Sequence, residues 1–292
     1  MAKPEMNRRD VLNLAIATGA ATTLLSGTAR SADAAPGIRI IDSNVSLFRW
    51  PFRRLPLDNP GALVAKCRSL GIAQAWAGSF EAILHRDIAG VNLRLADACK
   101  SRSELIPVGS VNPELPGWKD DLRRCVEEYE MPGIRLHPGY HGYTLTDPRF
   151  VQLLKSATST GRFVQIAATM EDTRTQHPKL QVPDVDVTPL TKLLPGILNA
   201  RVQILNARLR APLFEQLART PGVFFDTARV DGTDGISKLV QAAPGRVLFG
   251  THAPFLIPEA ALIRVHESGV LNETQLRAVY SKNAEIFGKA TA

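Results

Sequence analysis

The chain has 292 residues, of which 45% are hydrophobic and 22% are charged. This is the composition of an ordinary globular protein, and it excludes intrinsically disordered, collagen-like and disulfide-scaffold proteins. The 35 Lys and Arg residues exceed the 28 Asp and Glu residues and give a net charge of +7, but the basic residues are spread along the sequence and aromatic residues make up only 6%. Since a polyanion footprint needs clustered basic residues, we expect no nucleic-acid partner.

Residues 1–34 have the features of an export signal. Arg8 and Arg9 precede a mildly apolar run that ends at Leu25, and Ala32-Asp33-Ala34 forms an A-x-A cleavage site, as in twin-arginine signals. The run has about 14 residues, whereas a helix needs about 20 to cross a bilayer, so we expect cleavage rather than a stable membrane anchor. The sequence predicts a periplasmic or secreted protein with the twin-arginine translocase as its partner during export.

Short strands, each followed by a helix, recur through the rest of the chain. Eight strands alternating with eight helices predict a parallel sheet, and residues 35–292 suit a single domain, a (β/α)8 TIM-type barrel, with a last helix over Glu273–Phe287 on its outside. An open doubly wound sheet is the alternative. The expected strands are Ile38–Val45, Ile72–Gly78, Leu105–Val111, Gly133–His137, Phe163–Ala168, Val202–Asn206, Val223–Asp226 and Val247–Thr251.

The expected helices carry apolar residues at helical spacing, and the three cysteines lie within them. An odd number of cysteines far apart in sequence does not form a disulfide framework, so we expect them to be buried as small apolar residues. The helices are Ala62–Leu70, Ile88–Cys99, Trp118–Tyr129, Phe150–Thr160, Leu190–Leu198, Leu213–Ala218, Ile236–Ala243 and Pro258–Glu267.

Polar side chains gather at the carboxyl ends of the expected strands, where barrel enzymes keep their active sites. Such groups are costly to bury unless they pair or bind something, so they form the candidate site. The segment Glu171–Val187 lacks periodicity and has the length of a functional lid. The strand-end residues are Asp42, Asn44, Ser46, Glu81, Asn112, Arg135, His137, Thr169, Glu171, Asn206, Asp226 and His252; Trp50, Phe52, Tyr140 and Tyr143 are expected to wall the pocket.

Several segments resemble the amidohydrolase-related family, also called amidohydrolase family 2. They are Ile40-Ile41-Asp42, GIRLHPGYHGYTLTDPRF over Gly133–Phe150, and VLFGTHAPF over Val247–Phe255. The resemblance implies a (β/α)8 barrel that carries metal-dependent hydrolysis, lactone opening or decarboxylation of a small molecule. It also implies metal ligands at five strand-end positions, which hold other residues here: Asn44, Ser46, Ala167, Asn206 and His252.

These departures indicate that the metal site of the family, as usually built, is absent, since Ala and Ser cannot replace imidazole and Asn is a weak zinc ligand. A divalent metal on relocated ligands is one alternative, with candidates His137, His141, His177, His252 and Asp42. The pair His137 and His141 has helical spacing, but Pro138-Gly139 between them argues against a helix.

A second alternative is a metal-free hydrolase or lyase, and a third is a catalytically silent barrel that binds a small molecule or a protein. In the metal-free enzyme, His252 or His137 acts as general base, while Arg135 fixes a carboxylate or stabilises an oxyanion. The expected catalytic residues are His252, His137, Arg135 and Asp42, and the expected substrate-binding residues are Asn44, Glu81, Asn112, Glu171, His177 and Asn206.

Overall fold

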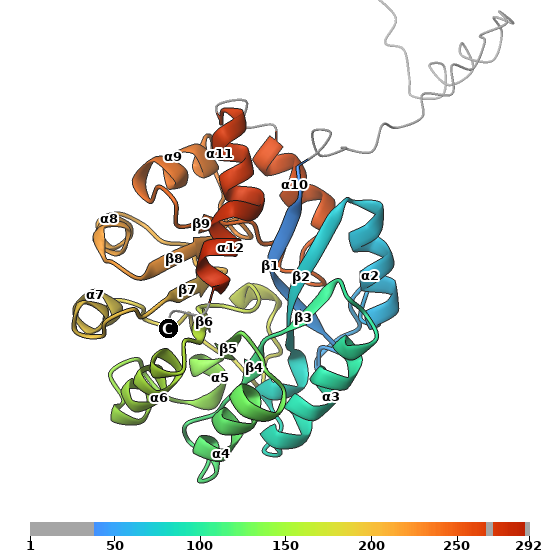
Figure 1. The fold of residues 1–292 in the computed structure, drawn as a ribbon, viewed down its shortest axis with the longest axis vertical. Helices are drawn as coiled ribbons and strands as arrows, with labels where there is room; N and C mark the ends of the chain where they lie inside the picture. Colours follow the sequence, from blue (N-terminus) through green and yellow to red (C-terminus); the bar gives the residue numbers. More distant parts are fainter. Residues whose placement is uncertain (1–37, 267–270, 290–292) are drawn as a thin grey trace, which may run out of the picture. The chain divides into compact units, whose positions relative to one another are not determined.

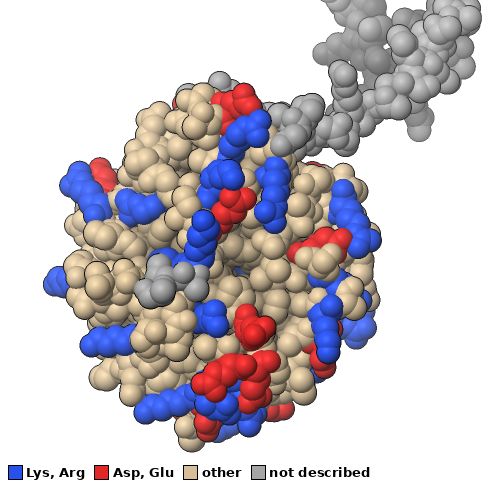
Figure 2. Space-filling view, in the orientation of Figure 1, with Lys and Arg blue, Asp and Glu red and all other residues tan. Residues whose placement is uncertain are grey.

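The computed structural model describes residues 38–266 and 271–289. The expected export signal over residues 1–34 lies outside this range. Within the described residues, no helix is long and apolar enough to cross a membrane. Figure 2 shows Lys and Arg distributed over one face, with acidic residues among them. Part of this mixing is ion pairing, as at Arg123, which pairs with Asp120, Glu127 and Glu128.

Parallel strands alternate with helices around a (β/α)8 barrel, as the sequence predicts (Figure 1). Every strand pair is parallel, so each connection crosses back over the outside of the sheet. The strands are β1 (Ile40–Leu47), β2 (Ile72–Ser79), β3 (Leu105–Pro107), β4 (Gly109–Ser110), β5 (Gly133–Leu136), β6 (Phe163–Ala167), β7 (Val202–Leu205), β8 (Val223–Asp226) and β9 (Val247–Leu248).

The third expected strand is divided into β3 and β4 on either side of Val108. The regular ladders therefore form two sheets, β1-β2-β3 and β4-β5-β6-β7-β8-β9. Pro107 has no N–H to donate, which weakens pairing at this point. Val108, between β3 and β4, still pairs with β2, because its N–H donates to the carbonyl oxygen of Ala77 over 2.8 Å.

Individual backbone hydrogen bonds join β1 to the segment that follows β9. The N–H of Ser43 donates to the Phe249 carbonyl, and the N–H of His252 donates to the Asn44 carbonyl, both over 2.9 Å. Val45 and Ala253 also form an isolated parallel bridge. These contacts bring the first and last strands together and complete the ring.

Helices surround the strands (Figure 1). In α6, Asp147 caps the amino terminus and Pro148 occupies the first turn, while Phe150, Leu153 and Leu154 face the core. The helices are α2 (Pro60–Ser69), α3 (Ile88–Lys100), α4 (Trp118–Arg123), α5 (Pro138–His141), α6 (Pro148–Ser159), α7 (Leu190–Leu193), α8 (Leu213–Arg219), α9 (Gly235–Ala242), α10 (Pro258–His266), α11 (Glu273–Arg277) and α12 (Asn283–Gly288).

The one-turn helix α5 corrects a sequence-based expectation. Pro138-Gly139 was expected to prevent a helix between His137 and His141, but Pro138 occupies the first helical position, where its missing N–H costs nothing. His137 is the N-cap residue, and Gly142 ends the helix in the left-handed conformation.

The last helical segment closes the amino-terminal end of the barrel. Instead of only covering the outside, Phe287 of α12 packs against Phe163, with ring centres 4.8 Å apart, and Trp76 stacks on Phe163 at 5.0 Å. These aromatic contacts fill the barrel beneath the strand-end polar groups. The expectation for the cysteines is confirmed: Cys67, Cys99 and Cys125 are free and buried.

Candidate active site

Arg135 lies inside the barrel, with only 2% of its surface exposed. Its guanidinium donates to the carbonyl oxygens of Val45 at 2.6 Å and Trp76 at 3.1 Å, and its Nε donates to Gln165 Oε1 at 2.8 Å. Gly78 in β2 leaves room for this side chain, because a Cβ there would lie 2.7 Å from Arg135 Nη1. Arg135 thus joins β1, β2, β5 and β6 from the inside.

The amides beside Arg135 extend this layer across the barrel. Gln165 donates to Gln203 Oε1 over 2.7 Å, and Gln203 donates to Ser43 Oγ over 2.8 Å. Ser43 Oγ in turn donates to the carbonyl of Phe249 over 2.8 Å. All of these side chains are buried, and Gln165, Gln203 and Ser43 each donate to an acceptor within the protein.

Asp42 receives three hydrogen bonds near the layer. Its Oδ1 accepts from the N–H groups of Asn44 and Thr251, each at 3.0 Å, and its Oδ2 accepts from Thr251 Oγ1 at 2.6 Å. Burial raises the pKa of Asp42, although these hydrogen bonds and the charge of Arg135 oppose the shift. Arg135 has its pKa lowered to about 10 by burial, so it remains a cation at neutral pH.

Asn44, Asn206 and Asp226 form a second hydrogen-bonded group at the strand ends. Asn44 Nδ2 donates to Asp226 Oδ2 at 2.6 Å and to Asn206 Oδ1 at 2.8 Å, and the Asn206 N–H donates to Asp226 Oδ1 at 3.1 Å. Burial raises the pKa of Asp226 to about 6, and the hydrogen bond from Asn44 offsets part of the effect. Asp226 can therefore both hold and release a proton near neutral pH.

The positions that the family gives to metal ligands do not fit a metal ion here. The Asn44 amide already donates to Asp226 and Asn206, the Asn206 amide donates to the Thr169 carbonyl, and Ser46 Oγ lies 3.4 Å from the Arg135 guanidinium. A fixed cation at this distance opposes the binding of a second cation. Within the described residues, no three His, Cys, Asp or Glu side chains are close enough together to hold a metal ion.

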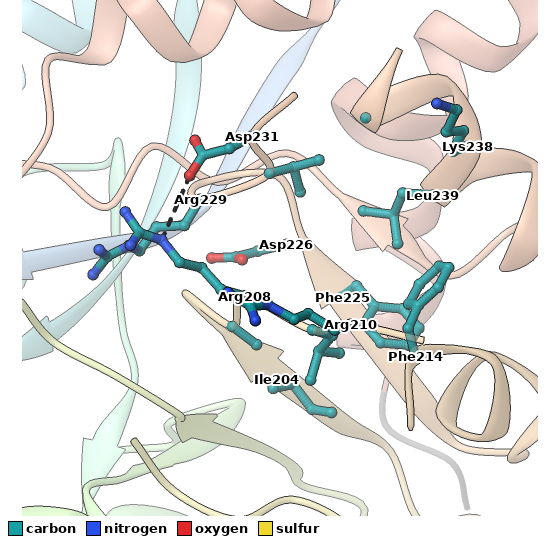
Figure 3. A pocket seen from close by; sticks show the side chains of 14 residues that line it. Ile204, Arg208, Arg210, Phe214, Phe225, Asp226, Arg229, Asp231, Lys238 and Leu239 are labelled. Carbon is teal, nitrogen blue, oxygen red and sulfur yellow. Dashed lines mark ion pairs between the residues drawn. The ribbon is translucent and has the colours of Figure 1, made fainter. Parts of the chain in front are cut away.

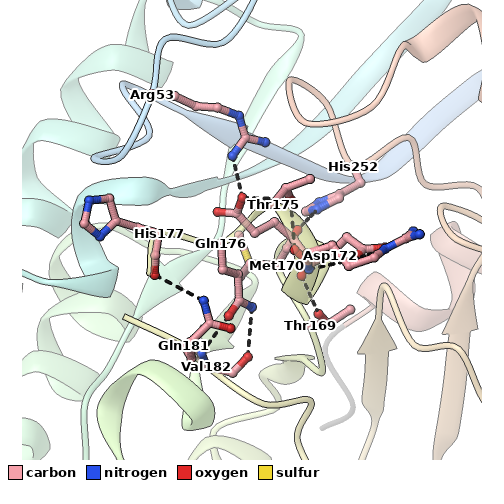
Figure 4. Close-up of polar contacts among 12 residues, drawn as sticks. Arg53, Thr169, Met170, Asp172, Thr175, Gln176, His177, Gln181, Val182 and His252 are labelled. Carbon is pink, nitrogen blue, oxygen red and sulfur yellow. Dashed lines mark hydrogen bonds and ion pairs between the residues drawn. The ribbon is translucent and has the colours of Figure 1, made fainter. Parts of the chain in front are cut away.

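Of the four histidines in the relocated-metal alternative, only His137 and His141 are neighbours, with ring centres 5.9 Å apart. His252 Nε2 is 2.7 Å from the carbonyl of Met170, His141 Nε2 is 2.9 Å from the carbonyl of Ala82, and the exposed ring of His177 stacks on Phe52. In Figure 4, His177 and His252 lie on opposite sides of the intervening loop. The relocated set, His137, His141, His177 and His252, therefore does not form a metal site.

His252 and His137 are buried and uncharged. Burial lowers the pKa of His252 to about 3, and burial, followed by His141 and Arg135, lowers the pKa of His137 well below its ordinary value. His252 donates to a carbonyl through Nε2, which leaves Nδ1 as its free acceptor. His137 Nδ1 is buried without a hydrogen-bond partner among the described residues.

The structure brings Asp42, Asn44, Arg135 and Asn206 into one buried region, but it places three other expected site residues elsewhere. Glu81 pairs with Arg94 at 2.8 Å, on the outside of the barrel. Asn112 accepts a hydrogen bond from the N–H of Glu114, within its own turn. The side chain of Glu171 is 3% exposed and forms an ion pair with Arg53.

Aromatic residues cover the carboxyl-terminal mouth. Trp50 is 2% exposed and contacts the rings of Phe52, Phe80, Tyr140 and Phe255 edge-on. The expected lid over Glu171–Val187 is an ordered loop in which Gln176 exchanges two hydrogen bonds with the backbone of Val182. The expected walls are thus confirmed as neighbours for Trp50, Phe52 and Tyr140, but they pack against one another and seal the mouth.

An open pocket of about 400 Å³ lies beside the ends of β7 and β8, against α8 and α9. Figure 3 shows Asp226 between arginine side chains on one side and an apolar group on the other. The apolar lining is Ile204, Leu209, Phe214, Phe225, Val230 and Leu239, and the charged lining is Arg208, Arg210, Asp226, Arg229, Asp231 and Lys238.

Arg229 is the unusual member of this lining, because only 9% of its surface is exposed and its guanidinium has no hydrogen bond or ion pair with any described residue. Burial and the charge of Arg208 lower its pKa, and the charges of Asp172, Asp184 and Asp231 oppose the shift. Arg208 itself pairs with Asp231 at 3.5 Å and Asp172 at 3.6 Å. A buried, unpaired cation next to a second cation is costly unless an anion binds between them.

Asp226 belonged to the expected strand-end site but had no expected catalytic or binding role, and neither Arg208 nor Arg229 was expected in the site. A signal was present in the spacing, since Arg208 follows the strand-end Asn206 by two residues and Arg229 follows the strand-end Asp226 by three. Both arginines therefore belong to the strand-to-helix loops that carry function in barrels.

Comparison with known proteins decides the family. Residues 50–287 match the amidohydrolase family model. The chain belongs to the amidohydrolase family. This confirms the resemblance found in the strand-end motifs, and it assigns the chain to a family of enzymes. Among curated proteins, no sequence matches this amidohydrolase family member significantly.

Solved structures share the barrel fold at low sequence identity. A 5-carboxyvanillate decarboxylase from Sphingomonas paucimobilis superposes with a TM-score of 0.69 at 10% identity, over 87% of this chain and 100% of that one. The 2,6-dihydroxybenzoate decarboxylase from Rhizobium gives 0.63 at 13%, over 85% and 98%. A 5-carboxyvanillate decarboxylase from Novosphingobium aromaticivorans, complexed with manganese and 4-hydroxy-3-methoxy-5-nitrobenzoic acid, gives 0.67 at 13%, over 86% and 96%.

Proposed function

We propose that the protein is an exported enzyme that needs no metal and acts on a small carboxylate-bearing molecule by a lyase reaction. The observation that carries this proposal is the buried and unpaired guanidinium of Arg229 in the same pocket as Asp226. Arg229 holds the carboxylate of the substrate, and Arg208 adds a second positive charge. Asp226 moves the proton.

The shape of the pocket favours a carboxylate attached to an apolar ring. Its volume of about 400 Å³ lies at the small end of the range for ligand sites. Phe214, Phe225 and Leu239 supply apolar surface, and Arg208 and Arg229 lie on the other side of Asp226 (Figure 3). The similar structures include decarboxylases named for such acids, 5-carboxyvanillate and 2,6-dihydroxybenzoate.

Decarboxylation suits the chemistry of Asp226. The protonated carboxyl group gives its proton to the carbon that bears the carboxylate, the carbon–carbon bond breaks, and its electron pair forms the new C–H bond as CO2 leaves. An acid with a pKa of about 6 can deliver this proton and be protonated again near neutral pH. Asn44 and Asn206 hold the carboxyl group in place throughout.

The test uses protein freed of metal by a chelator. Benzoate binding is measured by calorimetry, and CO2 release is measured with 2,6-dihydroxybenzoate and 5-carboxyvanillate. We expect Arg229→Met to weaken benzoate binding about 10- to 150-fold, and Asp226→Asn to abolish CO2 release while benzoate still binds. Failure of all three carboxylates to bind, or turnover that requires added Mn²⁺, would contradict the proposal.

A catalytically silent binding protein is the second candidate, favoured by the hydrogen-bond saturation of the strand-end groups. Both carboxylate oxygens of Asp226 already accept hydrogen bonds from the protein. A silent barrel would bind benzoate through Arg229 but would release no CO2 from any carboxylate, and Asp226→Asn would leave its properties unchanged apart from stability. Turnover therefore separates the two candidates.

Export is proposed from Arg8-Arg9 and the A-x-A site at Ala32-Asp33-Ala34. Cell fractionation tests it: the wild-type protein is expected in the periplasm or medium with an amino terminus at Ala35. Replacing both arginines by lysine should retain the protein in the cytoplasm. An uncleaved wild-type protein in the cytoplasm would contradict export.

A further inference from the structure

Two aspartates and one arginine carry formal charge in the buried polar region inside the barrel. Asp42 is 0% exposed, Arg135 is 2% exposed and Asp226 is 5% exposed. Both aspartates act on Arg135 as nearby opposite charges, Asp42 more strongly. Buried carboxylates are stabilised by hydrogen-bond donors and by a counter-charge; both aspartates accept hydrogen bonds, and Arg135 supplies the nearby positive charge.

The guanidinium of Arg135 is held in place by acceptors from several strands. Four of its five N–H groups point at fixed acceptors: the carbonyls of Val45 and Trp76 at 2.6 and 3.1 Å, Gln165 Oε1 at 2.8 Å and the Ser43 carbonyl at 3.4 Å. These acceptors come from β1, β2 and β6, and two of these strands, β1 and β6, carry ligand positions of the family. The planar guanidinium suits several fixed acceptors better than an ammonium does.

The sequence makes space for this cation as well as supplying it. Gly78 lies beside Arg135, and a Cβ at this position would approach Nη1 to 2.7 Å and Cδ to 2.9 Å. Ser46, at one of the departed ligand positions, lies 3.4 Å from the same Nη1. Ser46 and Gly78 therefore both leave room for the Arg135 guanidinium.

We propose that the guanidinium of Arg135 replaces the metal ion as the cation of the barrel interior, balancing Asp42 and Asp226 and holding β1, β2, β5 and β6 together. The fold and the pocket thus depend on Arg135 and not on a divalent ion. This inference rests on the metal independence of the proposed function, but its test reads stability, so the absence of turnover would leave it standing.

The experiment compares Arg135→Lys, which keeps the charge, with Arg135→Gln, which keeps polarity alone. Each variant is made with and without Asp42→Asn, which is a nearly isosteric change. The Oδ1 of the asparagine can still accept from the N–H groups of Asn44 and Thr251, and its Nδ2 can donate to Thr251 Oγ1. When Asp42 is present, we expect the equilibrium constant for folding, measured by denaturant unfolding, to be about tenfold or more larger for Arg135→Lys than for Arg135→Gln. With Asp42→Asn, the preference should fall to about threefold or less.

Arg201 is the control, because it is also buried, at 9% exposed, but bonds only to backbone carbonyls, those of Gly161, Phe287 and Lys289. Its preference for Lys over Gln should not change with Asp42→Asn. An Arg135 preference that is equally insensitive to Asp42→Asn would overturn the proposal, since the arginine would then act only through its hydrogen bonds.

Metal titration of the wild-type protein decides the matter independently, even where an Arg135 variant does not fold. The melting temperature is expected to be the same with chelator, Zn²⁺ or Mn²⁺, and no stoichiometric ion should remain after dialysis. One tightly held ion per chain that raises the melting temperature and is lost with Asp42→Asn would overturn the proposal.

Discussion

Removing the positive charge of Arg229 should weaken carboxylate binding and at the same time stabilise the protein. Arg229 is 9% exposed, has no ion-pair partner among the described residues, and is repelled by Arg208. Arg229→Met keeps the apolar stem and removes only the unpaired charge. Replacing an uncompensated buried charge by a side chain of similar volume is expected to raise the free energy of unfolding by about 1 kcal/mol.

The loss of binding follows from the charge-assisted hydrogen bonds that Arg229 would make. Such bonds contribute about 1.5–3 kcal/mol, so the Kd for benzoate should rise about 10- to 150-fold. Calorimetric titration measures the affinity, and denaturant unfolding measures the stability of the same preparations. The opposite signs of the two changes distinguish a binding residue from a structural one.

Arg246→Met is the control for this prediction. Arg246 is a half-buried arginine that donates to the carbonyls of Thr220 at 2.8 Å and Val223 at 3.1 Å and to that of Ala218. Its removal leaves these acceptors unsatisfied, so we expect a loss of about 1–3 kcal/mol in stability and an unchanged Kd. If Arg229→Met also destabilises the protein and leaves the Kd unchanged, the reasoning from unpaired charge is refuted.

Three further predictions concern pH and packing. Burial raises the pKa of Asp226 to about 6, so the negative charge of Asp226 is lost as pH falls through 6. Benzoate should therefore bind more tightly at pH 5 than at pH 7.5. In calorimetric titrations, Asp226→Asn should flatten this pH dependence. Gly78→Ala forces a Cβ against Arg135 and should cost about 1–3 kcal/mol in denaturant unfolding, whereas Gly117→Ala, with open space around it, should cost under about 1 kcal/mol. Burial lowers the pKa of His252 from 6.5 to about 3, so its contribution to stability is complete above pH 6.5 and is lost as pH falls toward 3; His252→Asn should therefore lose less stability than the wild type between pH 7 and 4.

The fold was predictable because its signals are local. Each strand is a short apolar run bounded by polar or turn residues, and each helix has its own apolar face, as in α6 with Phe150, Leu153 and Leu154. The departures arise where a single residue changes the local geometry. Pro107 interrupts the third strand, and Pro138 starts the short helix α5 that its own presence was expected to prevent.

The candidate site was only partly predictable, because its partners are distant in sequence. Asn44 and Asp226 are 182 residues apart, yet their side chains are 2.6 Å from each other. The strand-end rule places each of them near the mouth but does not indicate which pairs form or which groups are left unpaired. The sealing of the mouth by Trp50 and the opening of a pocket beside β7 and β8 depend on loop conformations, for which the sequence gives no periodic signal.

Two buried arginines show why hydrogen-bond partners, rather than burial, identify the binding group. Arg135 was expected to fix a substrate carboxylate, but the protein itself supplies its acceptors and its counter-charge Asp42, so an incoming anion would gain little from it. Arg229 has no hydrogen bond or ion pair with a described residue and lies in an open pocket, where Asp172, Asp184 and Asp231 are opposite charges beyond ion-pair distance. Since a bound anion recovers the free energy lost in burying an unpaired cation, the same residue type holds the barrel together at one position and is free to bind substrate at the other.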